Sequence, residues 1–558
     1  MAVIPSGARG EPQPQARRAD TGVIPSGARR ELASWRGAAL DVSCIAAAFA
    51  LALGLFLSAE LRIAGEIGLA AFPLDDSWIH LHFARNLAEG RGFSYNPGVP
   101  VAGSTAPLWT LLLAGVFRLA GSAPAWAKAL GVAATFGAAL VTRRLVWTWT
   151  DSRLLALAGG LAVVVSGPLV WAALSGMEVA LAALLVTGAL LAHVTHRDVT
   201  AALLLGLAVV TRPEAVLMAP LLWIAGPLTL RRSAVLGGII ALLVAPWLVF
   251  NLRTAGTPLP ATASAKIEGG LIGFLSGVRE SARTALVSRP WEFEVEWARW
   301  LFSVDALLPI LALLGLWGLW RRNGRRAVWP AAALVLHPLG MALLAPYRGP
   351  AFQEGRYSIH LLPLAIAVAL AGVAAVSVAD GKRGLLPVVL AGLFLVGALW
   401  NLPAAATRYA WAVQNIEAMQ VRLGQWIAAN TPARARLALN DVGAIAYLSR
   451  REVVDVMGLV TPAIIPYRRH GEQGVLAYLE RTCPDYLVIF PDWFPALSAM
   501  ADRFTPIHQI RLDHNTVAGA DLMVVYETPW NRWKRAAPCA GPVSEDRPRS
   551  PVFQERPV

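Results

Sequence analysis

Two adjacent carboxylates, Asp75 and Asp76, follow the first apolar run of the chain. A carboxylate can take the proton from a hydroxyl nucleophile, so this pair is the first candidate for general-base chemistry. The residues that follow, 76–89, have the apolar spacing of an amphipathic helix, which we expect to lie at the membrane interface. Asp76 begins this helix, where the helix dipole favours an anion, and Asp75 is then free to point into a cleft.

Two other interpretations of the acidic pair stay open. Both carboxylates could cap the helix and face water without a chemical role. Asp76 could instead share a divalent metal ion with His80, because residues four apart lie on one face of a helix. One aspartate and one histidine are few ligands for a metal, so the sequence assigns no metal site and leaves a divalent cation open as a cofactor.

The composition excludes an ordinary soluble enzyme. Of the 558 residues, 56% are hydrophobic and only 15% are charged, whereas soluble domains carry about 25% charged residues. The mean hydropathy is +0.52. These values indicate an integral membrane protein with many spanning helices. The net charge of +13 comes largely from arginines in short loops between apolar runs, so it indicates topology rather than nucleic-acid binding.

Paired basic residues between the apolar runs predict the topology. When each pair is placed in the cytoplasm, the runs alternate across the membrane, with about 11 crossings and one re-entrant or interfacial segment within 105–142. The expected spans are 38–59, which is typical of a retained signal anchor, then 154–174, 179–196, 198–212, 214–230, 233–250, 300–320, 327–346, 359–379 and 384–401.

The expected fold is a multi-span α-helical membrane protein with a small C-terminal α/β extracytoplasmic domain. The membrane domain covers 37–403, with a first outer loop at 60–104 and a second at 251–299. Residues 1–36 and 530–558 are rich in proline and arginine, and we expect them to be disordered tails, the first of them cytoplasmic.

The extracytoplasmic domain is expected at 404–529, where the composition turns polar. Strands that alternate with helices predict a small α/β layer. The expected strands are 437–440, 451–457, 485–490, 505–512 and 521–527, with helices at 408–430, 442–449 and 472–482.

The unusual polar motifs all fall on the outer side of this topology. They are PLDDSWIH (73–80), AGSTAPLW (102–109), LSGMEVA (174–180), TRPEA (211–215), NLRTAGTPLPATASAK (251–266) and EGRYS (354–358). This clustering predicts chemistry at the outer membrane surface. A transporter more often holds its site near the bilayer midplane between internal repeats, and the sequence has no matching half-repeats.

The stretch DDSWIHLHFARNLAEGRGFSYNPGVPVAGSTAPLWTLLLA (75–114) resembles the first outer loop of bacterial GT-C glycosyltransferases of the mannosyltransferase-like and terminal arabinofuranosyltransferase-like kinds. SGMEVAL, TRPEA, GRYSIHLLP and NDVGAIAYLSRREVVDVMGLVTP follow in the order of that family, so the resemblance covers most of 40–495. It implies a many-helix fold in the bacterial cytoplasmic membrane, a polyprenyl-phosphate sugar donor, and inverting transfer to a glycan, lipid or protein at the outer face.

The resemblance also implies roles for individual residues. Asp75, with Asp76 beside it, corresponds to the acidic motif that supplies the catalytic base. The leaving phosphate needs positive charge, and arginine suits it best because its planar fork binds two oxygens. The candidates for that role are Arg212, Lys266, Arg356 and Arg85, and the candidates for binding substrate are Glu178, Glu214, His80 and Tyr357.

Two alternative functions remain at this stage. One is a lipid or solute transporter, and the other is a membrane-anchored extracytoplasmic sensing protein without catalysis. The transporter predicts charges within the spans, and the sensing protein predicts that the acidic pair is dispensable. Neither explains why polar motifs recur in so many outer loops.

Overall fold

The computed structural model describes residues 26–68, 70–267, 269–379 and 385–533. Helix α1 is Ser26–Ala64. Its first part belongs to a separate unit, Met1–Cys44, and every other observation concerns the unit Ile45–Val558. The expected tails lie almost entirely outside the described residues.

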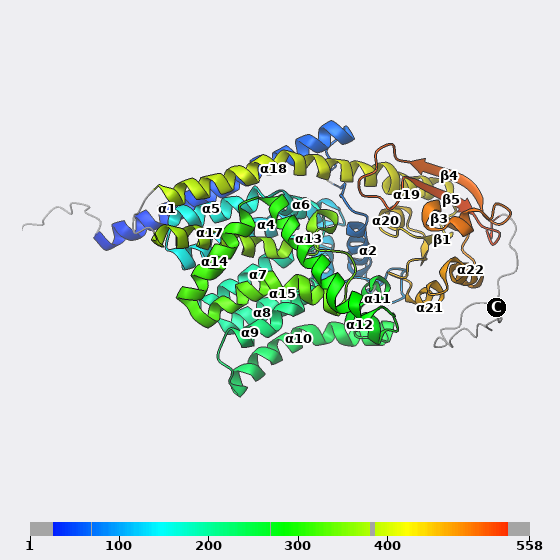
Figure 1. Ribbon diagram of the computed structural model, residues 1–558. Coiled ribbons are helices and arrows are strands. Elements are labelled where there is room, and N and C mark those ends of the chain that lie inside the picture. Colours follow the sequence, from blue (N-terminus) through cyan, green and yellow to red (C-terminus); the bar gives the residue numbers. More distant parts are fainter. Residues whose placement is uncertain (1–25, 69, 268, 380–384, 534–558) are drawn as a thin grey trace, which may run out of the picture. The chain divides into compact units, whose positions relative to one another are not determined.

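Most of the second unit is a bundle of helices that leads into a small sheet domain (Figure 1). The helices of the bundle are α2 (Asp76–Ala88), α3 (Pro107–Ala120), α4 (Ala125–Thr150), α5 (Arg153–Val164), α6 (Gly167–Leu174), α7 (Val179–Val194), α8 (Asp198–Val209), α9 (Ala219–Ile224), α10 (Leu230–Ala255), α11 (Ala261–Lys266), α12 (Gly270–Leu275), α13 (Arg289–Val304), α14 (Leu308–Asn323), α15 (Val328–Leu344), α16 (Phe352–Gly355), α17 (Leu362–Ala379) and α18 (Leu386–Ile416).

The apolar helices make the chain a multi-pass membrane protein. Among the described residues, six helical stretches are long and apolar enough to cross a membrane, and two bent pairs raise the number to eight. The pair α5–α6 bends by 54°, and the pair formed by α13 and α14 bends by 108°. The finer expectation of about 11 crossings is not confirmed, because α7 and α8 have 16 and 12 residues and a straight span needs about 20.

The segment 105–142 contains one long helix and one short one. Helix α3 has 14 residues, too few to cross alone, whereas α4 has 26. This arrangement agrees with the expectation that one of the two runs does not cross. Helix α4 continues through the basic pair Arg143 and Arg144 to Thr150.

The C-terminal domain contains all five expected strands. They are β1 (Arg436–Leu439), β2 (Glu452–Asp455), β3 (Tyr486–Ile489), β4 (Thr505–Arg511) and β5 (Leu522–Glu527), in the order β2-β1-β3-β5-β4. β1 pairs in parallel with β2 and β3, and β5 is antiparallel to β3 and β4. The helices of this domain are α19 (Arg422–Asn430), α20 (Ala444–Ser449), α21 (Ile465–Arg468), α22 (Gly471–Thr482) and α23 (Pro495–Ser498).

Alternation along the strands gives the sheet two buried faces. Leu437 and Leu439 of β1 pack on one face and Ala438 packs on the other, as the two-residue period of a strand requires. The face of Leu437 also buries Ile79 and Phe83 of α2, so the first outer loop is part of the core of the sheet domain.

Helix α2 lies between the bundle and the sheet domain, and ten of its residues are buried. Trp78 and Leu81 pack with Trp109 of α3, while Phe83 packs against the sheet domain. Protein therefore covers α2 on two sides, which hydropathy alone cannot reveal, and its expected place at a membrane interface stays a prediction.

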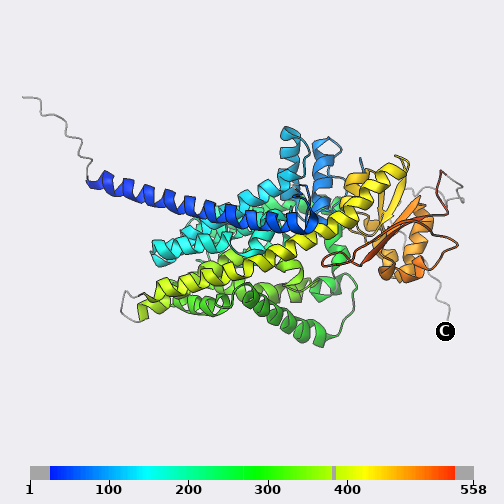
Figure 2. The same cartoon turned by 90° about the horizontal axis from the view of Figure 1, so that it is seen from above.

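Helix α18 is one continuous element from the bundle to the sheet domain, as both views show (Figures 1 and 2). The sequence analysis separates a span at 384–401 from a helix at 408–430. Pro403 lies inside α18 without ending it. A π turn then joins α18 to α19, so the helix continues without a break from the bundle into the sheet domain.

Helices α14 and α17 approach so closely that only glycine fits at their contact. A Cβ at Gly315 would lie 1.9 Å from the carbonyl oxygen of Val368, and a Cβ at Gly372 would lie 2.1 Å from that of Leu311. Both neighbours are backbone atoms and cannot rotate away.

We therefore expect Gly315→Leu to force these helices apart and to lower stability by about 1–3 kcal/mol. The matched control is Gly392→Leu in α18, where an added Cβ meets nothing within 4 Å. The measurement is the thermal unfolding midpoint of both variants in the same lipid. Equal midpoints would contradict the close-packing interpretation.

Candidate functional site

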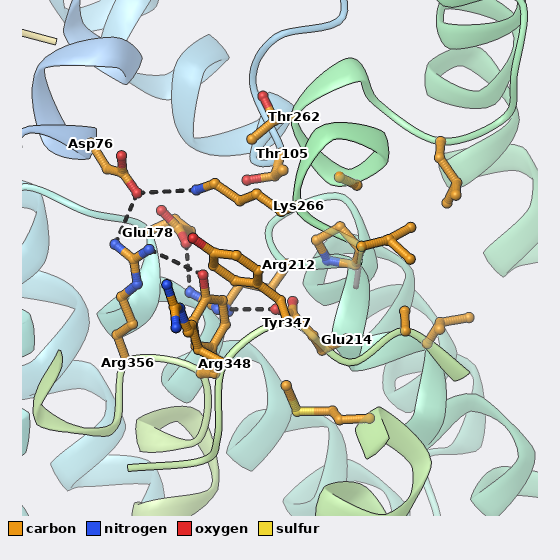
Figure 3. A pocket seen from close by; sticks show the side chains of 18 of the residues that line it. Asp76, Thr105, Glu178, Arg212, Glu214, Thr262, Lys266, Tyr347, Arg348 and Arg356 are labelled. Carbon is orange, nitrogen blue, oxygen red and sulfur yellow. Dashed lines mark hydrogen bonds and ion pairs between the residues drawn. The ribbon is translucent and has the colours of Figure 1, made fainter. Parts of the chain in front are cut away.

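Two cavities of the second unit meet at one cluster of charged side chains. The smaller cavity has a volume of about 260 Å³ and mostly apolar walls. The larger cavity, about 850 Å³, has more polar walls and borders the sheet domain. Both are lined by the same five residues, Asp76, Lys266, Tyr347, Arg348 and Arg356, so this cluster forms their common boundary (Figure 3).

Asp76 is held between two cations. Its Oδ2 lies 2.9 Å from Nη1 of Arg356 and 3.4 Å from Nζ of Lys266. Burial alone would raise the pKa of Asp76, but the charges of Lys266 and Arg356 outweigh it and hold the pKa well below its ordinary value. Asp76 is therefore ionised at neutral pH, with an oxygen in the space shared by the cavities.

A second buried ion-pair group lies beside the first. Arg212 Nη1 lies 2.6 Å from Oε1 of Glu178, and Arg212 Nη2 lies 3.1 Å from Oε1 of Glu214. Nε2 of His80 lies 3.2 Å from the other oxygen of Glu178. These pairs fix the guanidinium of Arg212 in the wall of the smaller cavity. The guanidinium carbon of Arg212 also lies 5.4 Å from the centre of the Tyr357 ring.

Backbone contacts between distant loops position Lys266. The amide of Ala261 donates to the carbonyl of Ala102 at 2.9 Å, which joins the start of α11 to the first outer loop. Thr262 Oγ1 donates to the carbonyl of Leu459 at 3.1 Å and also contacts the carbonyl of Gly103. Helix α11 is thereby held against the first loop and the sheet domain, and Lys266, its last residue, faces Asp76.

Asp75 points away from this boundary cluster toward the sheet domain. Its two carboxylate oxygens accept hydrogen bonds from the backbone amides of Gly443 and Ala444, at 2.7 and 2.8 Å. Burial and the nearby charge of Asp441 raise the pKa of Asp75 despite these bonds. With both oxygens bonded to the backbone, Asp75 joins the first loop to the start of α20.

Over most of its length, the chain has a fold similar to those of two solved membrane glycosyltransferases. ArnT from Cupriavidus metallidurans bound to undecaprenyl phosphate aligns with a TM-score of 0.53 and 15% identity, over 89% of this chain and 99% of ArnT. The apo state of ArnT gives 0.55. The Archaeoglobus fulgidus oligosaccharyltransferase in complex with Zn and sulfate gives 0.50 and 13% identity, over 85% of this chain and 73% of that protein. The chain has the GT-C fold.

Sequence comparisons give little information beyond the fold. Residues 413–538 match a family model described as a domain of unknown function, DUF8728. No curated protein matches the chain. The match covers the end of α18 and the sheet domain, and it leaves the rest of the bundle without a family match.

Most of the sequence-predicted site residues are brought together on this GT-C scaffold. The smaller cavity is lined by Asp76, His80, Glu178, Arg212, Glu214, Lys266, Arg356 and Tyr357. They come from five separate motifs of the sequence. Their roles remain predictions, but their convergence is an observation of the structure.

Arg85 is not part of this group. Its Nη1 donates to the carbonyl of Tyr447 at 2.8 Å, and its guanidinium carbon lies 4.1 Å from the centre of the Tyr447 ring. Arg85 lies on the sheet-domain side of α2 and lines neither cavity. The structure therefore does not bring Arg85 together with Lys266, Arg212 and Arg356, and its role in phosphate binding stays a prediction.

The pair proposed as metal ligands, Asp76 and His80, does not fit a divalent cation. Asp76 faces Lys266 and Arg356, whose charges would repel a metal ion. His80 is engaged by Glu178 on one ring nitrogen and lies 3.3 Å from Ser104 Oγ on the other. Within the described part of the chain, no three His, Cys, Asp or Glu side chains gather as a metal-binding group.

Sequence reasoning missed residues of the boundary and of the larger cavity. Tyr347 lies in the loop after α15, and no feature of the sequence singled it out. Asp441 lies in the wall of the larger cavity, 2.8 Å from Nε2 of Gln420. The NDVG motif after the first strand could have pointed to Asp441, because loops at the carboxyl ends of parallel strands commonly form binding sites.

The contact between Asp75 and Gly443 leaves no room for a side chain. A Cβ at Gly443 would lie 2.0 Å from the backbone oxygen of Asp75. We expect Gly443→Ala to separate α20 from the first loop, with faster proteolysis of the sheet domain. Gly392→Ala, which meets open space, is the control. Unchanged proteolysis in Gly443→Ala would show that this contact does not hold the domain.

Stability should depend on the protonation of Asp441. Burial and the charges of Asp76 and Asp455 raise its pKa from 3.8 to about 6, although a hydrogen bond from Gln420 opposes them. Because the folded state favours the protonated form, the stabilisation is complete below about pH 4 and is lost as the pH rises through about 6.

Unfolding midpoints of the wild type and of Asp441→Asn, measured from pH 4 to pH 8, test this sign. The variant has no carboxyl to ionise, so we expect the wild type to lose stability relative to it between pH 4 and pH 6. A constant difference across the range would contradict the raised pKa.

Proposed function

We propose that the protein is a glycosyltransferase that moves a sugar from a polyprenyl-phosphate donor to a glycan, lipid or protein acceptor at the outer face of the bacterial cytoplasmic membrane. One observation carries the proposal: an ionised carboxylate, Asp76, lies between two cations, Lys266 and Arg356, where an apolar cavity meets a polar one. The GT-C fold supports the reaction class.

The apolar cavity suits the lipid part of the donor. Its walls include Ile79, Leu217, Leu259, Ile272 and Met341, and it ends at the cationic cluster. A polyprenyl chain needs an apolar wall and its phosphate needs positive charge, so the cavity offers both in the required order. The structure of ArnT was obtained with undecaprenyl phosphate, which is a ligand of this chemical kind.

Lys266, Arg356 and Arg212 are the proposed phosphate-binding residues. They line the smaller cavity and are held in place by Asp76 and Glu178, so little reorganisation is needed when the phosphate binds. Glu178 and Glu214 bind Arg212, and His80 binds Glu178. We assign these three residues and Tyr357, which all line the smaller cavity, to binding the sugar.

Asp76 is the proposed base, in place of Asp75. Both oxygens of Asp75 are hydrogen bonded to backbone amides, whereas Asp76 faces the cavities. In the reaction, the acceptor oxygen bonds to the anomeric carbon, its proton passes to Asp76, and the electron pair of the broken bond leaves with the phosphate. One carboxylate is enough for this inverting displacement, because phosphate is already a good leaving group.

The ion pairs of Asp76 link donor binding to its basicity. In the free protein, Lys266 and Arg356 hold the pKa of Asp76 low, which makes it a weak base. A donor phosphate would draw these two cations to itself and add its own negative charge. Both effects raise the pKa of Asp76, so the base strengthens when the donor arrives.

The proposed orientation follows the distribution of charge and motifs. The N-terminal segment lies in the cytoplasm, and the cavities and the sheet domain, 404–529, lie outside. The acceptor then approaches from the extracytoplasmic side and the donor from the bilayer.

The test uses purified protein in lipid with a panel of radiolabelled polyprenyl-phosphate sugars. We expect the wild type to release or transfer the label, and Asp76→Asn to do so about 10²–10⁴-fold more slowly. The variant should bind the donor at least as tightly, because a negative charge near the phosphate is gone. Asp151→Asn, at the exposed end of α4, is the matched control.

Full activity of Asp76→Asn would remove Asp76 from the mechanism. Binding of a donor without turnover in the wild type and in the variant would favour a carrier. If no donor binds, the transferase proposal fails.

A further inference from the structure

The proposed function places the donor in the smaller cavity, and the walls of the larger cavity have a distinct chemistry. It is lined by Asp75, Gln353, Gln420, Asn440, Asp441, Arg468, Trp493 and Asn515, together with the boundary cluster. Four of these residues, Asn440, Asp441, Trp493 and Asn515, lie in connections that follow strands of the sheet domain. The sheet domain therefore builds much of a cavity that reaches Asp76.

Two amide side chains in this wall present unused hydrogen-bonding groups. Gln420 is buried and donates to Asp441 at 2.8 Å, but its Oε1 has no hydrogen-bond partner among the described residues. Oε1 of Gln353 is likewise buried and unpartnered within the described part of the chain. A buried carbonyl without a partner is costly, so its presence in a cavity wall points to a ligand that donates hydrogen bonds.

Gln353, in the wall of this cavity, has a strained backbone conformation. Gln353 has φ of 49° and Glu354 has φ of 62°, which L residues rarely adopt. A bidentate ion pair between Glu354 and Arg408 of α18, at 2.6 and 3.0 Å, holds the turn. Strain of this kind is costly and persists at sites where it positions a functional group.

Trp493 adds a half-exposed aromatic surface to the same wall. Its side chain is 43% exposed, and its Nε1 donates to the carbonyl of Gly519 at 3.0 Å. Its ring lies 5.3 Å from that of Phe490. A Cβ at Gly519 would lie 2.5 Å from the Trp493 ring, so the glycine permits this position. The indole is held by its polar end and offers apolar surface to the cavity.

We propose that this cavity binds the acceptor and that the acceptor is a glycan. A sugar ring has an apolar face of C–H groups, which suits an indole, and hydroxyls that both donate and accept, which suit amides. A lipid acceptor needs walls that are mostly apolar, and polar side chains form a larger share of the wall here than in the smaller cavity. The inference rests on the proposed transferase function and names its acceptor class.

The two cavities then divide the substrates between them. The donor lipid and phosphate fill the apolar cavity up to Lys266 and Arg356. The glycan enters between the bundle and the sheet domain, and one of its hydroxyls reaches Asp76 from the opposite side. A base at the boundary contacts both substrates, as the displacement requires.

The experiment measures how labelled sugar divides between transfer and hydrolysis. Wild-type protein in lipid receives a radiolabelled polyprenyl-phosphate sugar with soluble oligosaccharides, a lipid acceptor or a peptide. The variants are Trp493→Ala and Gln353→Gly, and the second relieves the backbone strain while removing the amide. Controls are Trp533→Ala, an exposed tryptophan outside both cavities, and Gln353→Asn, which keeps an amide and tolerates a positive φ.

We expect the wild type to transfer label to an oligosaccharide. In Trp493→Ala and Gln353→Gly the ratio of transferred to hydrolysed sugar should fall roughly tenfold, with a raised KM for the oligosaccharide. Trp533→Ala should match the wild type, and Gln353→Asn should recover part of the ratio.

The outcomes separate this inference from the proposed function. Label that is released or transferred by all proteins at the same ratio overturns the acceptor site and leaves the transferase standing. Transfer to the lipid or the peptide, and not to any oligosaccharide, also overturns the glycan assignment. If the wild type neither releases nor transfers label from any donor, both proposals fail.

Discussion

The buried ion pairs of Asp76 with Lys266 and Arg356 join three parts of the chain that are far apart in sequence. Asp76 comes from the first loop, Lys266 from the loop after α10, and Arg356 from the segment before α17. Each charge would be costly to bury alone, so the three elements are stable only together. The same pairs separate an apolar cavity from a polar one, and the proposed chemistry depends on that boundary.

Helix α2 is what places Asp76 at this boundary. One side of the helix packs on the bundle through Trp78 and Leu81, and another packs on the sheet domain through Phe83. Asp75 adds two backbone hydrogen bonds to the sheet domain. The first loop thus packs between the bundle and the sheet domain. A change in how the sheet domain docks would therefore move Asp76 relative to Lys266 and Arg356.

Local patterns predicted much of the fold, and tertiary contacts decided the rest. The five strands were found within one or two residues, because alternation of apolar residues depends only on neighbouring residues. The motif residues line one cavity, as their common side in the predicted topology led us to expect. The surroundings of α2, the contacts of Asp75 and the place of Arg85 could not be predicted, since each depends on how the sheet domain docks. Gln353 and Gln420 of the larger cavity carry no charge and lie outside the motifs that the sequence analysis singled out.

The titration of Asp76 tests most directly whether its cations hold it ionised until a phosphate arrives. Difference infrared spectra of the wild type minus Asp76→Asn, recorded against pH with and without undecaprenyl phosphate, report this one carboxylate. We predict a pKa well below the ordinary 3.8 in the free protein and a clear upward shift when the lipid phosphate is bound. A pKa that is ordinary in the free protein, or that the phosphate leaves unchanged, would contradict the proposed link between the donor and the base.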